Sequence, residues 1–453
     1  MFFLSCTITA SAQKAPPPEP SGTIKVEVKQ VLVPVIVTDR HGHHVTGLAA
    51  RDFRVFEEGV EQQIVAFATE MLDTPRVLPA ANFATPPPSV TAKPDARPQP
   101  SAPPRRTYVV CLDALNSSFA NFSRVREALG KLFQKERSTD SQYALLALGR
   151  SMVVVKYLTP NGEDILAAMR NKELDRAALQ SETANFAEQE RQLGTMLDKY
   201  CNECGCAGSR PGMNTRDLDK LMDSPGYCGG MLNNIMNFAA SAARERSLVG
   251  RQFIQNLRTL TEQLGRQPGK RILLLVSDGF SIWAGRDVYA TIGAFLGNPA
   301  VILRNPGERL GQEIEELARL ASSLSVSIYA LDSRGMAAAP TFGIFDAESE
   351  HGSLARNLGD LLVLAPEKQD AMILLATTTG GVFVGNSNDL LRGMRQAFAD
   401  GREYYVLAYV PADRTEDGKF RKTRVELKDK KLTVRAKHGY WAHRPPSLPP
   451  SSP

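Results

Sequence analysis

Long apolar runs are missing from this chain of 453 residues. Its longest continuous apolar stretches, at residues 108–112 and 272–276, are far shorter than the ~18 residues that cross a bilayer. We therefore expect no transmembrane span. The sequence also lacks a G-x-S-x-G nucleophile elbow, an H-E-x-x-H helix and a complete phosphate loop, so the common signatures of hydrolases and nucleotide-binding enzymes are absent.

An excess of one charge sign is also missing from most of the chain. The formal net charge is +5, but residues 419–437 contain nine Lys or Arg and two Asp or Glu, which gives +7 there and −2 elsewhere. A Lys-rich hairpin edge of this kind protects a sheet against strand-to-strand aggregation. No recognition helix or aromatic stacking motif accompanies it, so we do not expect nucleic-acid binding.

The first 23 residues have features of an export signal. A short apolar stretch ends at Ala10-Ser11-Ala12, which fits a small-x-small cleavage pattern, although a basic segment before it is absent. We therefore expect an extracytoplasmic location, either periplasmic or secreted.

Four of the six cysteines lie in one short window, at Cys201, Cys204, Cys206 and Cys228. A zinc site would favour two paired C-x2-C arms, and only one such arm is present. In an oxidising compartment two disulfides are the preferred interpretation, with three connectivities open and a metal site as the alternative. Cys111 lies inside an apolar run, where we expect a small buried thiol.

Short β-rich runs occupy both ends of the chain. They lie at residues 24–72 and 402–443, and a Pro-rich linker at 73–106 follows the first segment. Three histidines at 41, 43 and 44 predict a solvated turn between two strands. Neither segment holds enough strands to fold alone, so we expect them to pair into one small β-sandwich. The Pro-rich tail at 444–453 is expected to be disordered.

Between these ends, residues 107–401 alternate buried strands with amphipathic helices. Continuous apolar strands joined by helices of period 3.6 predict a doubly wound, mostly parallel, Rossmann-like α/β sheet. Residues 172–250, which carry the cysteines, interrupt this pattern as an insertion. The sequence thus predicts an α/β domain inserted into, or flanked by, the small β-sandwich.

Two of the apolar strands end in carboxylates, Asp113 and Asp278. In an open α/β sheet the functional crevice lies beyond the carboxyl ends of the strands, where the strand order reverses, so we expect both side chains at one edge. With Ser117 and Ser277 nearby they would form an all-oxygen site suited to a hard divalent cation. The alternative is that each Asp caps the helix that follows it.

Several short motifs, in this order, resemble a von Willebrand factor A-type (VWA) domain. They are the strand at 108–113 with Asn116-Ser117 behind its Asp, the run 272–279 ending in Ser-Asp-Gly, and residues 375–384. More narrowly, residues 52–67 and 404–440 are similar to VWA-related exported proteins abundant in acidobacteria. The resemblance covers about residues 24–443, apart from the linker and the insertion.

This resemblance implies a metal-ion-dependent adhesion site that binds Mg²⁺, or Mn²⁺ or Ca²⁺. Asp113 and Ser117 match the family's Asp-x-Ser-x-Ser motif, Leu115 replaces its first Ser, and Asp278 matches its late Asp. The family's middle-loop Thr has no counterpart in the sequence. A ligand set that lacks two oxygens is a degenerate form of the site.

The function implied by the resemblance is adhesion or scaffolding, with a partner protein docked above the sheet. The candidate docking residues are Asn116, Ser118, Phe119, Ser281 and Trp283. For Trp283, burial under a loop is the alternative. We do not expect an enzyme. The other two hypotheses are a hydrolase that uses Asp113 and Asp278 in general acid/base catalysis, and a disulfide- or metal-stabilised module that acts through residues 172–250.

Overall fold

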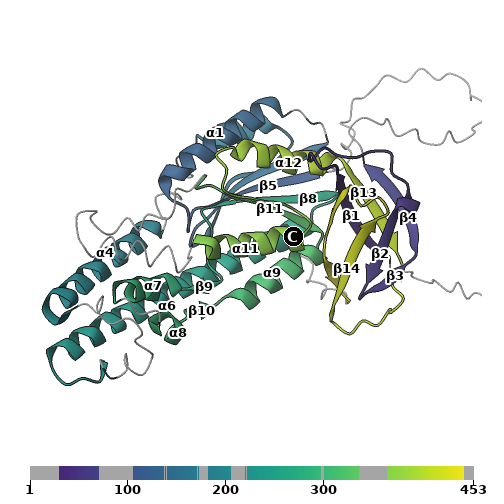
Figure 1. The fold of residues 1–453 in the computed structure, drawn as a ribbon. Coiled ribbons are helices and arrows are strands. Elements are labelled where there is room, and N and C mark those ends of the chain that lie inside the picture. Colours follow the sequence, from purple (N-terminus) through teal and green to yellow (C-terminus); the bar gives the residue numbers. More distant parts are fainter. Residues whose placement is uncertain are drawn as a thin grey trace, which may run out of the picture.

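The computed structural model describes residues 30–70, 106–136, 138, 140–170, 172, 182–205, 220, 222–296, 300–335 and 365–442. These residues form an α/β part built on a six-stranded sheet and a β part built from two four-stranded sheets (Figure 1). The predicted export signal, nearly all of the predicted linker and the C-terminal tail lie outside the described residues.

The six-stranded sheet has the order β12-β11-β8-β5-β6-β7. Every neighbouring pair is parallel except β6 and β7, which form a hairpin. The chain order reverses between β5 and β8, which places a switch point at the carboxyl ends of these two strands. The strands are β5 (Arg106–Asp113), β6 (Ser141–Leu148), β7 (Met152–Thr159), β8 (Lys270–Ser277), β11 (Val326–Asp332) and β12 (Phe383–Val384).

Helices cover both faces of this sheet (Figure 1). Because side chains alternate along a strand, Tyr108 and Val110 of β5 face one hydrophobic cluster and Val109 and Cys111 face the other. This two-sided burial explains why the strand is a continuous apolar run. The first cluster includes α1 (Phe119–Lys135), α2 (Gly162–Ala168) and α12 (Leu390–Arg402), and the second includes α6 (Tyr227–Gly265), α9 (Gly311–Ser323) and α11 (Ala365–Thr378).

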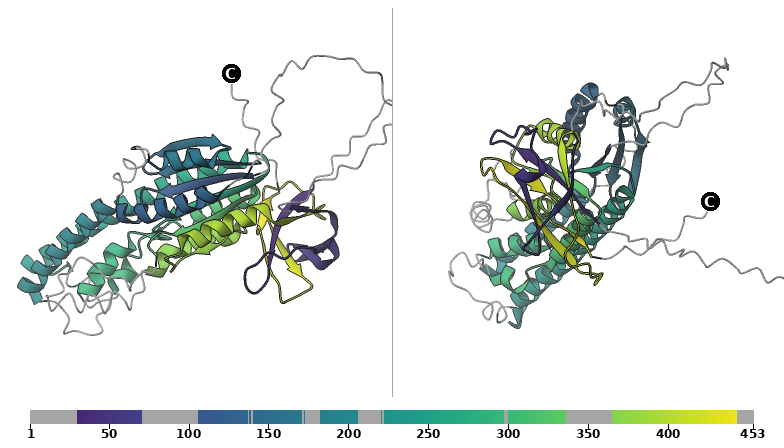
Figure 2. Two further views of the ribbon diagram at one scale, coloured as in Figure 1. Left: turned by 90° about the horizontal axis from the view of Figure 1, so that it is seen from above. Right: turned by 90° about the vertical axis from the view of Figure 1, so that its right-hand side faces the viewer.

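The cysteine-bearing region extends from the carboxyl end of the sheet, away from the β part (Figures 1 and 2). Its long helix α6 has 39 residues, or roughly 58 Å, and runs on beneath the sheet. The predicted limit of the insertion at residue 250 therefore falls inside one continuous helix. The other elements here are α4 (Thr183–Tyr200), the π-helical turn η2 (Cys201–Gly205), β9 (Trp283–Ala284), α7 (Arg286–Phe295), α8 (Ala300–Arg304) and β10 (Glu308–Arg309).

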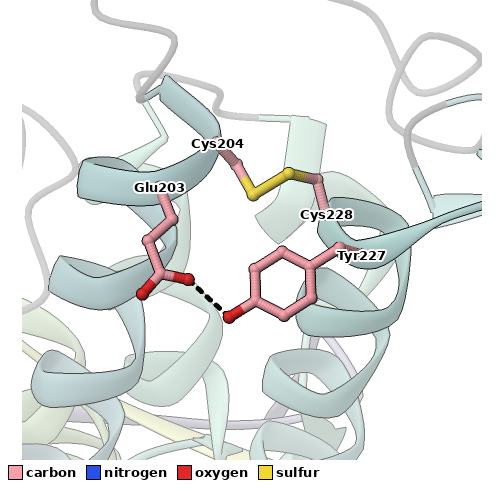
Figure 3. Close-up of a disulfide and its surroundings, with 4 residues drawn as sticks. All are labelled: Glu203, Cys204, Tyr227 and Cys228. Atoms are coloured by element: carbon pink, nitrogen blue, oxygen red, sulfur yellow. Dashed lines mark hydrogen bonds between the residues drawn. A yellow bond between two sulfur atoms is a disulfide. The ribbon is translucent and has the colours of Figure 1, made fainter.

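A disulfide between Cys204 and Cys228 joins η2 to the start of α6 (Figure 3). Beside it, the Tyr227 hydroxyl donates to Glu203 at 2.5 Å. Cys201 is disulfide-bonded as well, and Cys206 lies outside the described residues. Cys111 is a free, buried thiol, as the sequence predicts. The disulfide interpretation of this cysteine window is thus supported by the described bond.

The β part combines both ends of the chain, as the strand count predicts. Its sheets have the orders β15-β1-β13-β4 and β16-β14-β2-β3, so N-terminal strands pair with C-terminal strands in each. One hydrophobic cluster contains side chains of both sheets. The elements are β1 (Val31–Thr38), η1 (Ala50–Asp52), β2 (Phe53–Glu57), β3 (Val60–Gln62), β4 (Ile64–Glu70), β13 (Tyr404–Tyr409), β14 (Phe420–Leu427), β15 (Thr433–Ala436) and β16 (Gly439–Trp441).

The β part packs where the central strands β8 and β11 begin (Figure 1). At this junction the Ser322 hydroxyl of α9 donates to the Gly439 carbonyl at 2.9 Å. The carboxyl ends of the strands lie at the opposite end of the sheet, about 25 Å away along the eight residues of β8. Among the described helices, none combines the length and apolar character needed to cross a membrane.

Candidate functional site

Three neighbouring strands deliver a carboxylate to the same edge of the sheet. β5 ends at Asp113, Asp278 directly follows β8, and β11 ends at Asp332. We call this edge the rim and define it as residues 113–118, 277–283 and 332–334. Asp113 and Asp278, which are far apart in sequence, lie close together there: the Ser117 hydroxyl accepts a hydrogen bond from the Asp278 N–H at 3.0 Å.

Asp113 is a fully buried carboxylate that is held by its own loop. Its Oδ1 accepts hydrogen bonds from the N–H groups of Leu115 at 3.0 Å and Asn116 at 2.9 Å. The Asn116 amide contacts both oxygens, at 3.2 and 2.9 Å, and the Ser277 hydroxyl donates to Oδ2 at 2.5 Å. Burial raises the pKa of Asp113 to about 6, against the opposing effect of these hydrogen bonds. Such a group is held in place by protein donors rather than by solvent.

Asp278 caps the start of α1 from a different strand. Its Oδ2 accepts from the Ser118 N–H at 2.9 Å, and the Asn121 amide contacts both carboxylate oxygens at 2.9 and 2.8 Å. Ser118 is the N-cap residue of α1 and makes no side-chain capping bond, so Asp278 supplies an acceptor that the helix terminus needs. The Ser333 hydroxyl completes the set with a 2.5 Å bond to Oδ1.

Asp332 connects the loop after β11 to neighbouring elements through hydrogen bonds. Its carboxylate accepts from Arg334, through Nε at 3.0 Å and Nη2 at 2.8 Å, and from the Gln369 amide at 2.8 Å. Arg124 of α1 donates to the carbonyls of Ser333 and Arg334, at 3.2 and 2.7 Å. Sequence reasoning did not single out Asp332, although Leu331-Asp332-Ser333 repeats the pattern of an apolar strand followed by Asp. Asn121, which contacts Asp278, is marked by no comparable sequence pattern.

The acceptor atoms of the rim do not fit a divalent cation. An ionised carboxylate offers about four lone-pair sites, and Asp113 receives five hydrogen-bond contacts and Asp278 receives four. Leu115, where the family's motif has a serine oxygen, is fully buried. Over the described ranges there is also no group of three or more His, Cys, Asp or Glu side chains that could hold a metal. The rim is therefore organised by hydrogen bonds.

A cavity of about 120 Å³ opens beside the rim, between the loop after β8 and the base of the insertion. Small-molecule sites usually have roughly 300–1,000 Å³, so this cavity has the scale of one protruding side chain. Its lining includes Arg246, which donates to Asp287 at 2.9 Å and lies 4.5 Å from the centre of the Phe186 ring. The cavity lining is thus partly apolar, and the charge of its Arg246 is already paired with Asp287.

Two of the five predicted docking residues line this cavity. Asn116 and Ser281 line it and are half-buried, whereas the Ser118 backbone is engaged with Asp278. Trp283 is half-buried in β9, where its backbone N–H donates to the Ser281 hydroxyl at 3.0 Å and the Arg309 guanidinium lies 5.8 Å from its ring centre. Phe119 begins α1, and its side chain lies outside the described part of the structure.

No protein-family model and no curated protein matches this sequence. Among solved structures, the chain is similar to an aerotolerance-related membrane protein from Bacteroides fragilis NCTC 9343, with 11% identity over 64% of this chain and 97% of that chain and a TM-score of 0.29. It is also similar to BatB from Bacteroides thetaiotaomicron, with 11% identity over 65% of this chain and 98% of that chain and a TM-score of 0.27.

A third similar structure is the pilus adhesin SpaC from Lactobacillus rhamnosus GG in its open conformation. The identity is 10%, the match covers 77% of this chain and 44% of the adhesin, and the TM-score is 0.31. At these identities and TM-scores the likeness carries no argument about function. The α/β class of the chain rests on its own strand order and helices.

Proposed function

We propose that this chain is an exported, non-enzymatic VWA-type module that binds a partner protein at the rim of its α/β sheet. The observation that carries the proposal is the meeting of the loops after β5, β8 and β11 beside a cavity of side-chain size. In chain order the sheet is arranged 3-2-1-4-5-6, with the reversal between β5 and β8. Open sheets of this kind bind their ligands at that point.

Two further observations support the finer parts of the proposal. The two four-stranded sheets share one hydrophobic cluster, which favours a small β-sandwich formed from both ends of the chain. The Cys204–Cys228 disulfide favours an oxidising, extracytoplasmic compartment.

The burial of Asp113 and the hydrogen bonds of Asp278 favour binding over the alternative hydrolase. A pKa of about 6 suits a general acid or base, but a catalytic carboxylate must come within about 3 Å of a substrate proton. Asp113 is 0% exposed, and Asp278 already accepts four hydrogen-bond contacts. The same contacts lead us to propose that docking at this rim proceeds without a divalent cation.

Site-specific photocrosslinking in the native envelope tests the docking position. A benzophenone side chain at Ser281, beside the cavity, is expected to give discrete crosslinks to one partner protein. Thr183→Arg, which introduces a long side chain at the cavity from α4, is expected to abolish them. A benzophenone at Val60, an exposed residue of the β part, is the matched control and is expected to give none.

The same experiment separates the rim from the insertion. Tyr227 is exposed at the disulfide-bonded tip of the insertion, so a benzophenone there reports on that surface. Crosslinks from Tyr227 with none from Ser281 would assign binding to the insertion and refute the rim. Equal crosslinks from Ser281 and Val60 would indicate nonspecific proximity and would also refute it.

A further inference from the structure

A second cavity lies at the opposite end of the sheet, at the junction between the β part and the α/β part. Its volume is about 540 Å³, within the roughly 300–1,000 Å³ typical of small-molecule sites. Both parts of the molecule contribute to its walls. The polar and basic lining includes Ser323, Ser325, Arg414, Thr415 and Lys437.

Lys437 is the buried cation of this cavity. Lys437 is only 7% exposed, and its ammonium donates to the Ser325 hydroxyl at 2.9 Å. An ammonium has three N–H donors, and within the described ranges no carboxylate lies at ion-pair distance from this one. A buried charge with so little compensation is costly unless an anion accompanies it.

The surroundings of Lys437 add positive charge instead of removing it. Lys270, the first residue of β8, is also buried and donates to the Ser327 hydroxyl at 3.1 Å. Burial, together with the charges of Arg271 and Lys270, lowers the pKa of Lys437 to about 8. The Nε atom of Arg271 is a buried donor that has no hydrogen-bond partner in the described structure.

Asp400 is the carboxylate that acts on this cluster, and its acceptors are already used. It accepts from the Arg435 guanidinium, the Tyr329 hydroxyl and the His44 ring, each at 2.7 Å. The Nη1 atom of Arg435 still lacks a partner among the described residues. Among these cations, Arg435 pairs with Asp400 and Lys270 lies within reach of the Asp400 charge.

We propose that this junction cavity binds a small oxyanion, a carboxylate or a phosphate, through the ammonium of Lys437. The hydroxyl of Ser325 positions that ammonium, and Arg414 at the exposed mouth has no ion-pair partner in the described ranges. Asp413 and Glu416 also line the mouth, and both are exposed. Asp413 forms an ion pair with Arg421 at 2.9 Å, and Glu416 also interacts with another group of the protein. Of the charged lining residues, only Lys437 is buried, and Asp413, Arg414 and Glu416 are exposed. This site is independent of the rim.

Thermal unfolding of the full chain tests the proposal. Inorganic phosphate and malonate are titrated separately against sodium chloride of equal ionic strength. We expect one or both oxyanions to raise the Tm saturably, by about 3–5 °C at a hundred times Kd, while chloride does not. A larger response to phosphate than to malonate, or the reverse, identifies which oxyanion the site takes. Equal shifts in all three salts, or no shift, would overturn the proposal.

Lys437→Met keeps most of the length of the side chain and removes its charge. Because the substitution removes a poorly compensated buried cation, the variant is expected to fold with an unchanged or higher Tm in chloride and to lose the oxyanion response. Lys430→Met, at an exposed lysine of the β part, is the control and is expected to keep it. An undiminished response in Lys437→Met refutes the site.

If the Lys437→Met variant fails to fold, Ser325→Ala provides the test. This substitution is expected to weaken oxyanion binding at least several-fold, and unchanged binding would likewise refute the site.

Discussion

Replacing Asp400 with asparagine is expected to loosen the junction between the β part and the α/β part. The Asp400 side chain is fully buried on α12 and joins segments that are distant in sequence. Its hydrogen bonds reach His44 near the N-terminus, Tyr329 on β11 and Arg435 on β15. The substitution keeps the shape of the side chain and removes the charge that these donors share.

The expected loss of stability is large for a single isosteric change. Removing one partner of a buried ion pair costs about 3–5 kcal/mol, because the remaining charge is left uncompensated. Asparagine retains one acceptor oxygen, so we expect a loss of about 3 kcal/mol, or roughly 3–5 °C in Tm for a chain of this length. Urea unfolding followed by circular dichroism measures it. Glu61→Gln, at an exposed carboxylate paired with Arg54, is the control and is expected to change the midpoint little.

The pH dependence of this difference provides a second check. Burial alone would raise the pKa of Asp400, but the hydrogen bond with His44 and the charge of Arg435 hold it below its ordinary value of 3.8. A carboxyl group whose pKa is lower in the folded state contributes stability above its unfolded pKa and loses that contribution as the pH falls through the folded pKa. The difference in the free energy of unfolding between the unsubstituted protein and the Asp400→Asn variant should therefore be constant from about pH 7 to pH 5 and narrow below about pH 4. A difference in the free energy of unfolding under about 1 kcal/mol, or one that persists unchanged in acid, would refute the reasoning.

Three further outcomes follow from the rim and the insertion. Millimolar Mg²⁺ is expected to leave the Tm unchanged, and a rise that Asp278→Ala abolishes would establish a cation site instead. Gly285→Ala is expected to destabilise the protein by about 1–3 kcal/mol in urea unfolding, because φ is +78° and the new Cβ would lie 2.6 Å from the Ala243 Cα; no loss would show that the turn adapts. Cys204→Ser opens a disulfide that spans 24 residues and should cost about 3 kcal/mol, and an unchanged midpoint would show that the tip does not contribute to global unfolding.

The position of the rim followed from local patterns in the sequence. A continuous apolar run that stops at an Asp marks a buried strand and the polar loop behind it, and parallel neighbours bring such loops to one edge. This reasoning brought Asp113 and Asp278 together. The pairing of the two chain ends was predictable for a similar reason, because neither terminal segment holds enough strands to form a stable sheet alone.

The contacts of those side chains depended on the tertiary structure. Whether a carboxylate faces a cation or an N–H group depends on which residues of other elements point toward it, and Asn121 and Ser333 lie on a helix and a strand end that periodicity does not align. His44 illustrates the same limit. Sequence reasoning placed it on a solvated turn, and this was wrong: it is half-buried, and its partner Asp400 is 356 residues away.

The Lys-rich segment at 419–437 shows what composition by itself determined and what it left open. Its excess of positive charge is plain in the sequence, and a solvated sheet edge is the usual interpretation. In the fold, Arg421 is buried beside Asp413 and Asp417, whereas Lys437 is buried against Ser325 of the α/β part and Arg435 reaches Asp400. Sequence determines how many charges a segment carries, but only the packing of distant segments decides which of them leave water and need a counter-charge.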